Sequence, residues 1–512
     1  MRTAIDASDL AQALRSWARR YGKRMAVAGE RDALTFAALD RAADAWAAAL
    51  RAAGCGPGAH VGLLAGNSPA WLAVAFGVWR AGATLVPIST FVSARELGEI
   101  LEHADIATVV AQPRLRSHDY LAMLETLPAA QRPQQIIALS PDPVDDACQG
   151  SNVSPEAAGI DPQSNACILY TSGTTGRAKG VMLSHRAMLA TVLPTSARTG
   201  LTAQDSLLST LPLFWVAGLV IRALPTLAAG CALLLVESFT PAAVLAALRR
   251  HRPTALHLRP PQIGQIVAHP DFDASLLARV CKGGGRAAWY QPYLDPDSTR
   301  MITGYGMTET AGYATALDWQ DPPAVRATAI GRPLPGVELR VVGADGQSCA
   351  PGVPGEVRVR GPGLFSGYYK QPPGTGLDAD GYFCTGDLGR IDAGGVFHFS
   401  GRSKDLLRVK GINVSPVEVE TVLGTHPAVD SVYVIGLPPD GLEQELVALV
   451  VTRADAALPE AELRALTGQQ LSHYKRPAQY VHIRHGDVPL SGTSKPQRAA
   501  LAALATRRLA PT

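Results

Sequence analysis

Short apolar runs alternate with helical stretches along the first part of the chain. Residues 38–53, 68–79 and 94–103 have a helical pattern, and the segments 60–64, 83–87 and 107–110 that follow them are typical strands. Parallel strands need long crossover connections, which are usually helices. The alternation, which resumes after residue 183, therefore predicts a parallel sheet covered by helices on both faces.

The pattern changes twice towards the C-terminus. Between Gly331 and Gly401, short strand-like runs lie between Gly and Pro turns, which predicts a small antiparallel or barrel-like unit. After Arg402 helices and strands are mixed again. Ser415 is followed by a proline and, three positions later, by Glu418, which is a strong helix start. The chain from Arg402 onward is therefore predicted to be a separate domain.

Composition places the chain among globular proteins of about three domain-sized units. Of its 512 residues 47% are hydrophobic and 18% are charged, and the net charge is only +3. No long basic run suggests nucleic acid as a partner. The seven cysteines are scattered without a CxxC pair, which favours a reducing cytoplasm and argues against a structural zinc site.

The sequence does not predict a membrane span. The most apolar long stretch, residues 219–236, is interrupted by Arg222 and Pro225. We expect it to form a buried helix and strand. The N-terminus carries Asp6 and Asp9 and lacks the apolar core of a signal peptide.

Residues 170–180 form a loop of small residues, hydroxyls and a lysine between two apolar runs, and the whole segment is predicted to be strand, loop and strand. Glycines let backbone N–H groups converge on an anion, and a lysine adds charge, so the loop has phosphate-binding chemistry. Its spacing is not that of a Walker A loop. A polar hairpin tip explains the same residues equally well. The residues in question are Thr171, Ser172, Gly173, Thr174, Thr175, Gly176 and Lys179.

Two further segments carry candidate ligands. In residues 304–310, Tyr305 could stack on a purine, Thr308 could bind a phosphate oxygen and Glu309 could hold Mg²⁺. Asp387 offers two acceptor oxygens that suit vicinal hydroxyls. Taken alone, both segments are ordinary turns.

Residues 170–180 resemble the signature loop of the adenylate-forming superfamily, the acyl-CoA synthetases and their relatives. Four further blocks match that family in the same order, and the resemblance spans nearly the whole chain. It implies an α/β fold with a large N-terminal domain, residues 1–401. This domain has two doubly wound α/β subdomains and a small β-barrel-like unit. A small, mobile α+β C-terminal domain, residues 402–512, would follow a hinge at Lys404.

The resemblance also implies roles in binding ATP. The loop with Lys179 would hold the phosphates, Thr308 the α-phosphate, and Glu309 the Mg²⁺. Asp387 and Arg402 would bind the ribose. Further nucleotide contacts are implied for Gly284, in the glycine cluster 283–285, and for Tyr305 and Gly306.

The remaining implied roles concern the acid and CoA. Lys495 matches the catalytic lysine, although Ser494 and Pro496 depart from the usual pattern around it. Arg408 and Gly411 belong to a loop that would serve the CoA step. Two residues would border the acyl pocket, namely Trp215, which stands where many relatives have His, and Gly312. His185 is given no catalytic role.

The sequence thus predicts a cytoplasmic, ATP-dependent ligase that converts a hydrophobic carboxylic acid to its acyl-CoA thioester through acyl-AMP, with Mg²⁺ and CoA. The pocket neighbours are apolar or aromatic and offer no partner for a second charge, so an aromatic, alicyclic or medium-chain monocarboxylate is expected. They are Trp215, Val216, Ala217, Ala311, Gly312 and Tyr313. An enzyme that loads a carrier protein and a catalytically silent binding homologue are the alternatives. The oligomeric state is left open.

Overall fold

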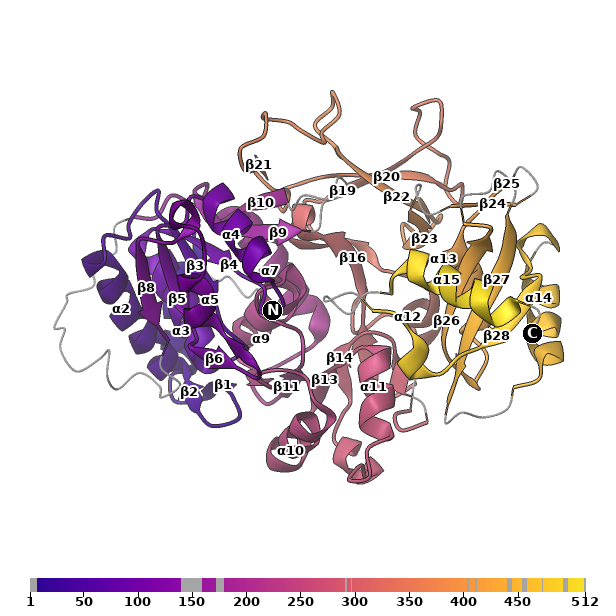
Figure 1. Ribbon diagram of the computed structural model, residues 1–512, viewed down its shortest axis with the longest axis horizontal. Coiled ribbons are helices and arrows are strands. Elements are labelled where there is room, and N and C mark those ends of the chain that lie inside the picture. Colours follow the sequence, from indigo (N-terminus) through magenta and orange to yellow (C-terminus); the bar gives the residue numbers. More distant parts are fainter. Residues whose placement is uncertain are drawn as a thin grey trace. The chain divides into compact units, whose positions relative to one another are not determined.

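The chain forms two compact units in the computed structural model. The structure describes residues 7–139, 159–171, 179–290, 292–295, 297–402, 406–409, 412–439, 444–453, 458–471, 473–490 and 496–510. Unit 1 consists of Met1–Leu258, Asp273–Leu339 and Val359–Phe383, and unit 2 of Arg259–Phe272, Arg340–Arg358 and Cys384–Thr512. Figure 1 labels their helices and strands.

The first seven-stranded sheet of unit 1 has the order β21-β10-β9-β4-β3-β5-β8. Strands β4, β3, β5 and β8 are parallel, and β9 joins them in parallel. At the other edge β10 is antiparallel to β9, and β21 is antiparallel to β10. The prediction of a parallel sheet is confirmed. The strands are β3 (His60–Leu64), β4 (Thr84–Pro87), β5 (Thr108–Ala111), β8 (Gln135–Ala138), β9 (Asn165–Thr171), β10 (Lys179–Ser184) and β21 (Gly367–Tyr368).

The second seven-stranded sheet has the order β15-β14-β13-β11-β12-β1-β2. All its neighbouring strands are parallel except β2, which is antiparallel to β1 at one edge. The strands are β1 (Met25–Ala28), β2 (Ala33–Thr35), β11 (Ser206–Ser209), β12 (Ala232–Leu235), β13 (Ala255–His257), β14 (Lys282–Gly284) and β15 (Arg300–Ile302).

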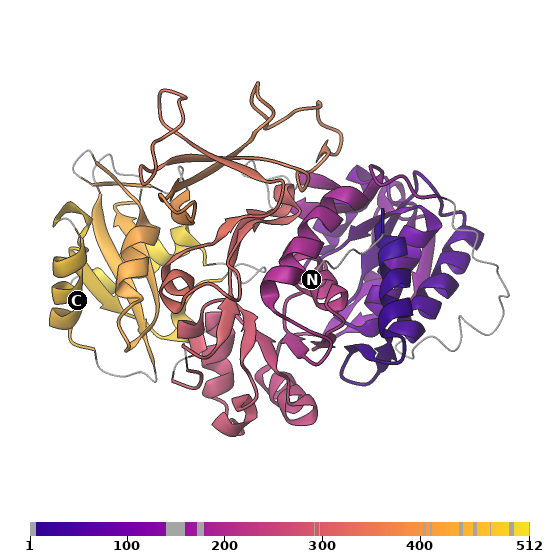
Figure 2. The ribbon, with the colours of Figure 1, turned by 180° about the vertical axis from the view of Figure 1, so that it is seen from behind.

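Helices complete the core of unit 1. Helix α3 (Pro69–Ala81) is apolar on nearly all sides and almost wholly buried, as expected of a helix covered by other elements. It contacts α1 (Leu10–Tyr21), α2 (Phe36–Ala52), β3 and β4. Figure 2 shows these N-terminal helices, in indigo, over one face of the first sheet. The others are α4 (Ala94–His103), α5 (Tyr120–Glu125), α7 (His185–Thr199), α8 (Val216–Gly218), α9 (Leu224–Ala228), α10 (Pro241–His251) and α12 (Pro323–Thr328).

The predicted helix and strand in residues 219–236 are present and buried. A five-residue π-helical segment, η2 (Leu219–Ala223), leads into α9, and β12 follows. Arg222 is therefore inside a helical segment of unit 1. Nearby, a three-stranded antiparallel sheet is formed by β16 (Gly304–Met307), β17 (Gly312–Ala316) and β18 (Arg332–Pro333).

The longest segment of unit 2 is Cys384–Thr512, which contains both helices and strands. The part predicted to be antiparallel or barrel-like holds a four-stranded sheet of β19 (Glu338–Val342), β20 (Gly355–Arg360), β22 (Phe383–Ile391) and β23 (Phe397–Arg402). A second sheet consists of β26 (Val429–Leu437), β27 (Glu445–Thr452) and β28 (Gln479–His482). The remaining elements are β24 (Leu407–Val409), β25 (Ile412–Val414), α11 (Pro260–Val267), α13 (Pro416–Leu423), α14 (Glu460–Gln470) and α15 (Arg498–Leu509).

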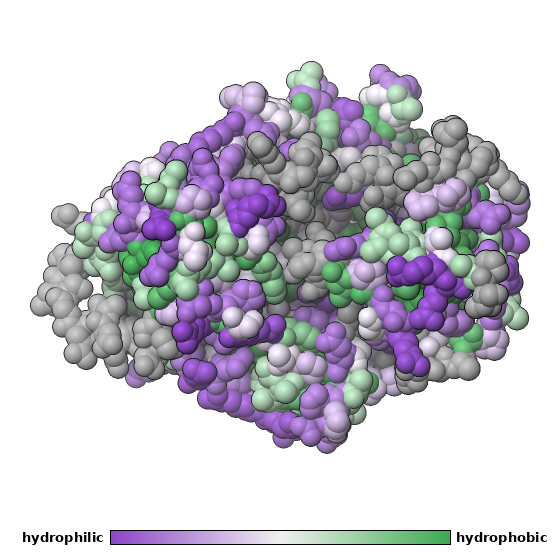
Figure 3. Space-filling view, viewed as in Figure 1, coloured by the Kyte–Doolittle hydropathy of each residue, from purple (hydrophilic) through white to green (hydrophobic). Residues whose placement is uncertain are grey.

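The predicted helix start at Ser415 is confirmed. The Ser415 side chain accepts a hydrogen bond from the backbone N–H of Glu418, and the helix begins at Pro416. Among the described residues, no helix is both long and apolar enough to cross a membrane. On the face shown in Figure 3, hydrophilic and hydrophobic residues are interspersed.

Candidate active site

The two arms of the predicted phosphate loop form an antiparallel hairpin. Thr171, the last residue of β9, pairs with Lys179, the first residue of β10. At the other end of β10, Ser184 caps α7 through a hydrogen bond from Ala187 N. The strand–loop–strand prediction is therefore confirmed for both arms. The predicted loop residues Ser172, Gly173, Thr174, Thr175 and Gly176 lie outside the described residues.

Lys179 and Glu309 meet at the ring of Tyr368. The Lys179 Nζ lies 4.8 Å from the centroid of that ring. The Tyr368 hydroxyl donates a hydrogen bond of 2.9 Å to Glu309 Oε1, and burial together with the neighbouring Glu309 charge raises the pKa of the phenol. A cation and an acidic oxygen that are far apart in the sequence thus lie on two sides of one aromatic side chain.

The segment with Thr308 and Glu309 is a single turn between two antiparallel strands. The turn, η5 (Thr308–Thr310), joins β16 to β17. Tyr305 is 7% exposed, so little of its ring is open to a stacking purine in this structure. Gly306 lies so close to β17 that a Cβ there would overlap the carbonyl oxygen of Gly312. This close approach requires glycine and fixes the direction of the turn.

Glu309 fits the chemistry of a magnesium ligand. Among the described residues, no group of three or more His, Cys, Asp or Glu side chains could hold a metal. Mg²⁺ is often bound by one carboxylate together with phosphate oxygens and water, so a single protein ligand is sufficient. Within the described part of the chain, Oε1 has the Tyr368 bond and Oε2 has no hydrogen-bond partner.

Gly284 lies against charged and polar side chains. It is the last residue of β14, and a Cβ at this position would overlap the Arg222 guanidinium and the His257 ring. Arg222 donates through Nε to His257 Nδ1 and through Nη2 to the Tyr313 hydroxyl, at 3.0 Å. Glycine at 284 is therefore explained by the space that this cluster occupies.

Trp215 belongs to an aromatic group at the start of α8. Its ring centroid lies 5.4 Å from that of Phe214 and 6.2 Å from that of Phe91. Phe91 is 49% exposed, whereas Phe214 is buried. Gly312, the other predicted acyl residue, has a positive φ, and a Cβ there would lie 2.9 Å from Ile221 Cγ1.

In unit 2, the two predicted ribose ligands form an ion pair. Asp387 and Arg402 are register partners in β22 and β23, and Arg402 Nε lies 2.9 Å from Asp387 Oδ1. The Asp387 side chain is only 3% exposed, while that of Arg402 is 47% exposed. The backbone N–H of Asp387 is bonded to Thr385 Oγ1, which orients the turn before the pair.

The other predicted residues of unit 2 have less structural description. Arg408 lies in β24, which pairs with β25, and its side chain is not described. Lys404, Gly411 and Lys495 lie outside the described residues. Their roles stay predictions.

Three functional candidates were missed by the sequence analysis. Tyr368, which links Lys179 to Glu309, follows an ordinary turn and carries no motif. Arg222 was noted only as an interruption of an apolar stretch, and His257 not at all. A charged residue inside an apolar segment was the available signal for Arg222, because such a residue needs a partner when it is buried.

Comparisons with known proteins agree with this geometry. A family model described as "AMP-binding enzyme" matches residues 14–369, and one described as "AMP-binding enzyme C-terminal domain" matches residues 418–495. The chain belongs to the family of AMP-binding enzymes. The superfamily that the sequence resembles is thereby confirmed.

Similar proteins cover nearly the whole of this AMP-binding enzyme. A feruloyl-CoA synthase from an Amycolatopsis species is 34% identical over 477 residues, 91% of this chain and 94% of that protein. A sulfoacetate–CoA ligase from Cupriavidus necator is 32% identical over 484 residues, 92% of each chain. The crystal structure of ATP-bound MatB from Rhodopseudomonas palustris has a TM-score of 0.78 at 28% identity and covers 95% of this chain and 98% of that one.

The reaction class follows from this membership. The chain is an AMP-forming acid–CoA ligase that acts through an acyl-adenylate. Its small-molecule substrates include a carboxylic acid, ATP and CoA, and Mg²⁺ is the metal of the reaction.

Proposed function

We propose that this AMP-binding enzyme activates a monocarboxylic acid with a hydrophobic body and transfers the acyl group to CoA. For the nucleotide side, the proposal is supported by the contacts that Tyr368 makes with Lys179 and with Glu309. For the acid, support comes from an apolar cluster of Ile221, Tyr313, Ala316 and Leu334, with Ala217 and Val337 packed against it. Two of these residues, Ala217 and Tyr313, belong to the predicted pocket neighbours.

In the first half reaction the carboxylate attacks the α-phosphorus of ATP, which forms acyl-AMP and releases pyrophosphate. The carboxylate is already a nucleophile, so the protein mainly positions reactants and stabilises charge. In this proposal Lys179 holds the β- and γ-phosphates together with the loop that precedes it, and Thr308 binds the α-phosphate. Glu309 would hold Mg²⁺, which would neutralise charge on the phosphates when bound. Tyr368 orients the Glu309 carboxylate through its hydrogen bond.

The roles in unit 2 are also part of the proposal. The Asp387–Arg402 pair would bind the ribose, because the carboxylate accepts from vicinal hydroxyls while the half-exposed guanidinium holds it in place. Lys495 would bridge the carboxylate and the α-phosphate during adenylation. Arg408 and Gly411 would serve the CoA step. A mobile C-terminal domain from residue 402, with its hinge at Lys404, would exchange these two groups.

The proposed setting is a reducing cytoplasm. The cysteines among the described residues, such as Cys55, Cys167 and Cys231, are all free thiols. Proteins of oxidising compartments commonly use cysteines in disulfides. The oligomeric state has no part in the proposal.

The acid is the open variable, and an acid panel tests it. ATP–pyrophosphate exchange should be measured with aromatic, alicyclic and medium-chain monocarboxylates, and with sulfoacetate and dicarboxylates as charged competitors. We expect the hydrophobic acids to give the highest kcat/KM. A panel in which charged acids or amino acids are preferred would contradict the proposal. If none of the acids supports exchange, the chain would be a silent binding protein.

The acceptor is tested with the same acids. CoA and a phosphopantetheinylated carrier protein end in the same thiol arm, so they should be compared directly at equal concentration. Faster thioester formation on CoA supports the proposal. Faster loading of the carrier protein would favour the alternative of an acyl-adenylating carrier-loading enzyme.

A further inference from the structure

Arg222 is a buried cation that has no anionic partner among the residues that the structure describes. It is 3% exposed and lies in the π-helical segment η2 of unit 1. Within the described part of the chain it has no carboxylate partner, and its contact with the Ile221 carbonyl is long, at 3.4 Å. A buried charge is costly unless it is paired and hydrogen-bonded, and such groups cluster at functional sites.

The other fully buried arginines of the described residues are satisfied differently. Arg80 pairs with the carboxylates of Asp40 and Asp44. Arg326 donates to the Thr299 carbonyl at 2.6 Å and to the Asp321 carbonyl at 3.0 Å. These two bond to carboxylates or to backbone carbonyls, although Arg80 Nε and Arg326 Nη2 are buried without a partner among the described residues. Arg222 has instead an imidazole nitrogen and a phenol, both of which are weaker acceptors than a carboxylate.

The cluster around Arg222 presents hydrogen-bond donors. Nε–H and one Nη2–H are used by His257 and Tyr313, which leaves further N–H groups of the guanidinium. The Tyr313 hydroxyl accepts the Arg222 bond, and its own proton has no acceptor among the described residues. The guanidinium also lies near the Tyr313 ring, 5.7 Å from its centroid. The cluster therefore has hydrogen-bond donors that could bind a further acceptor.

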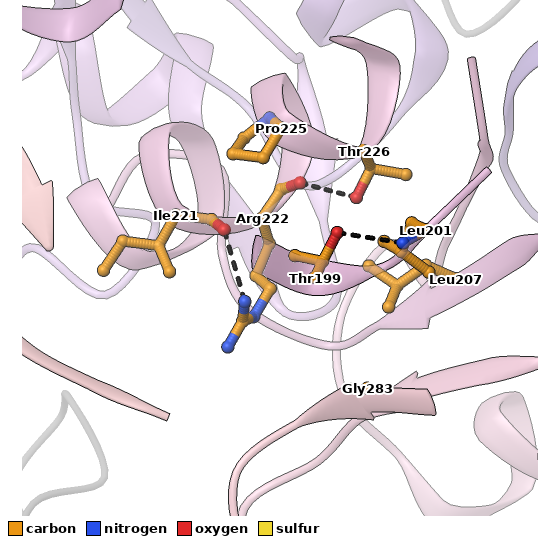
Figure 4. A pocket seen from close by; sticks show the side chains of 8 residues that line it. All are labelled: Thr199, Leu201, Leu207, Ile221, Arg222, Pro225, Thr226 and Gly283. Atoms are coloured by element: carbon orange, nitrogen blue, oxygen red, sulfur yellow. Dashed lines mark hydrogen bonds between the residues drawn. The ribbon is translucent and has the colours of Figure 1, made fainter. Parts of the chain in front are cut away.

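The cluster lies beside the residues assigned to the acyl pocket. Tyr313 is next to Gly312 in β17, and Ile221, the neighbour of Arg222, lies close to Gly312. Figure 4 shows the Arg222 side chain extending away from Leu201 and Leu207. The cavity lined by Leu201, Leu207 and Gly283 has a volume of only about 10 Å³, which is room for about one water, so the acid does not bind there.

We propose that Arg222 and Tyr313 recognise an uncharged oxygen acceptor, a carbonyl or a phenolic oxygen, on the hydrophobic body of the acid, remote from the reacting carboxyl group. This rests on the proposed function. An uncharged oxygen suits the site because the cost of desolvating a second carboxylate among Ile221, Ala217 and Val337 would offset its attraction to Arg222. Acids without the oxygen leave a buried donor unpaired and are disfavoured.

Matched acids test the proposal across body sizes. The pairs are 3-phenylpropanoate with 3-(4-hydroxyphenyl)propanoate, cyclohexanecarboxylate with 4-oxocyclohexanecarboxylate, and hexanoate with 5-oxohexanoate, with adipate as the dicarboxylate. The readout is kcat/KM for pyrophosphate release. We expect the oxygenated member of at least one pair to be preferred by about 10- to 100-fold, as for a hydrogen bond to a charged group.

Variants assign the preference to the cluster. In Arg222→Met the preference should fall to near one, and in Tyr313→Phe it should fall partly. Arg326→Met is the matched control, a buried arginine outside this cluster, and should keep the full preference. Three results would overturn the proposal. The wild-type enzyme could show no preference within any pair, Arg222→Met could keep the wild-type preference, or adipate could be preferred over 5-oxohexanoate.

Binding separates this inference from the proposed function. Acyl-sulfamoyl-adenosine analogues of the same pairs bind without turnover, and their Kd values can be measured by calorimetry. If no acid supports pyrophosphate release, the proposed function fails, and the Kd ratio still decides the role of Arg222. Binding of any analogue shows that the protein is folded. Equal Kd values within every pair would therefore overturn the inference, even if the enzyme has CoA-ligase activity. If Arg222→Met does not fold, the Kd ratio is measured for Tyr313→Phe instead. A ratio equal to that of the wild type would overturn the inference.

Discussion

The proposed nucleotide side and the proposed acyl side of unit 1 are built in different ways. Lys179 and Glu309 belong to two short contiguous segments, and both residues contact a third residue, Tyr368. The acyl side assembles Arg222, His257 and Tyr313 from three separate elements around Gly284. Phosphates can be held by one loop of adjacent backbone donors, whereas a selective pocket needs side chains that converge from several elements.

This difference implies that the two sides can be damaged separately. Changes on the nucleotide side should lower the rate with every acid by the same factor. Changes on the acyl side should alter the ratio between acids and leave the KM for ATP nearly unchanged. The four predictions below test that separation, beginning with the largest effect.

Glu309→Gln removes the proposed metal charge and should reduce adenylation of all acids by about 100-fold or more, as for the loss of a main electrostatic contact. Tyr368→Phe is the matched control, because it removes only the hydrogen bond to Glu309 Oε1, and it should cost about tenfold or less. Pyrophosphate release over a Mg²⁺ titration measures both. A selective loss with one acid would contradict the assignment of Glu309 to the nucleotide side.

Gly284→Ala tests to which side this glycine belongs. The new methyl group would displace the Arg222 guanidinium and the His257 ring. We expect a loss of about tenfold in the preference for oxygenated acids, because the cluster loses its alignment. Gly56→Ala, where a Cβ meets no atom within 4 Å, is the control. A change confined to the KM for ATP would instead support the adenine-facing role implied by the resemblance.

Trp215→Ala should shift the preferred size of the acid by a few-fold in kcat/KM and alter the KM for ATP less. The reason is its position in the aromatic group with Phe214 and Phe91, at the start of α8. A homologous series of linear acids, assayed at saturating ATP, measures the shift. If only the ATP kinetics change, Trp215 does not border the acyl pocket.

His185 belongs to neither side and should affect stability alone. It is 1% exposed, and burial lowers its pKa to about 4, so the folded protein holds it neutral. In the unfolded chain it binds a proton below a pH of about 6.5. Stability is therefore fully present above pH 6.5 and is lost as the pH falls towards 4, by about 2 kcal/mol at pH 5.

Denaturant unfolding of His185→Gln at pH 7.5 and pH 5 checks this effect. The glutamine does not titrate, so the variant should lose less stability than the wild type between these two pH values. An equal loss in both proteins would show that other groups cause the acid sensitivity. A changed pH profile of adenylation at constant stability would contradict the absence of a catalytic role.

Local patterns in the sequence predicted much of what the structure contains. Strand β3 and helix α4 have the predicted bounds, and α13 begins at Pro416 as its cap indicates. Their signals lie within a few neighbouring residues. Lys179 and Glu309 were expected to have two separate roles, because no local pattern reveals Tyr368, the side chain that both of them contact.

The acyl side was harder to predict for a physical reason. The sequence suggested a pocket without a partner for a second charge, since the named neighbours around Trp215 and Gly312 are apolar. The structure adds Arg222, which an apolar stretch conceals, and brings it to Tyr313, which is 91 positions away in the chain. Such a contact depends on how the strands are ordered in the sheet, and periodicity does not specify that order.

The most direct test of the account is a single turnover without and then with CoA. Enzyme in excess over ATP labelled at the α-phosphate is mixed with Mg²⁺ and a preferred hydrophobic acid, and the products are resolved by chromatography. We expect acid-dependent formation of labelled acyl-AMP and of pyrophosphate first, and then complete conversion of the label to AMP with one equivalent of acyl-CoA after CoA is added. Formation of ADP, or of AMP without acid, would contradict it.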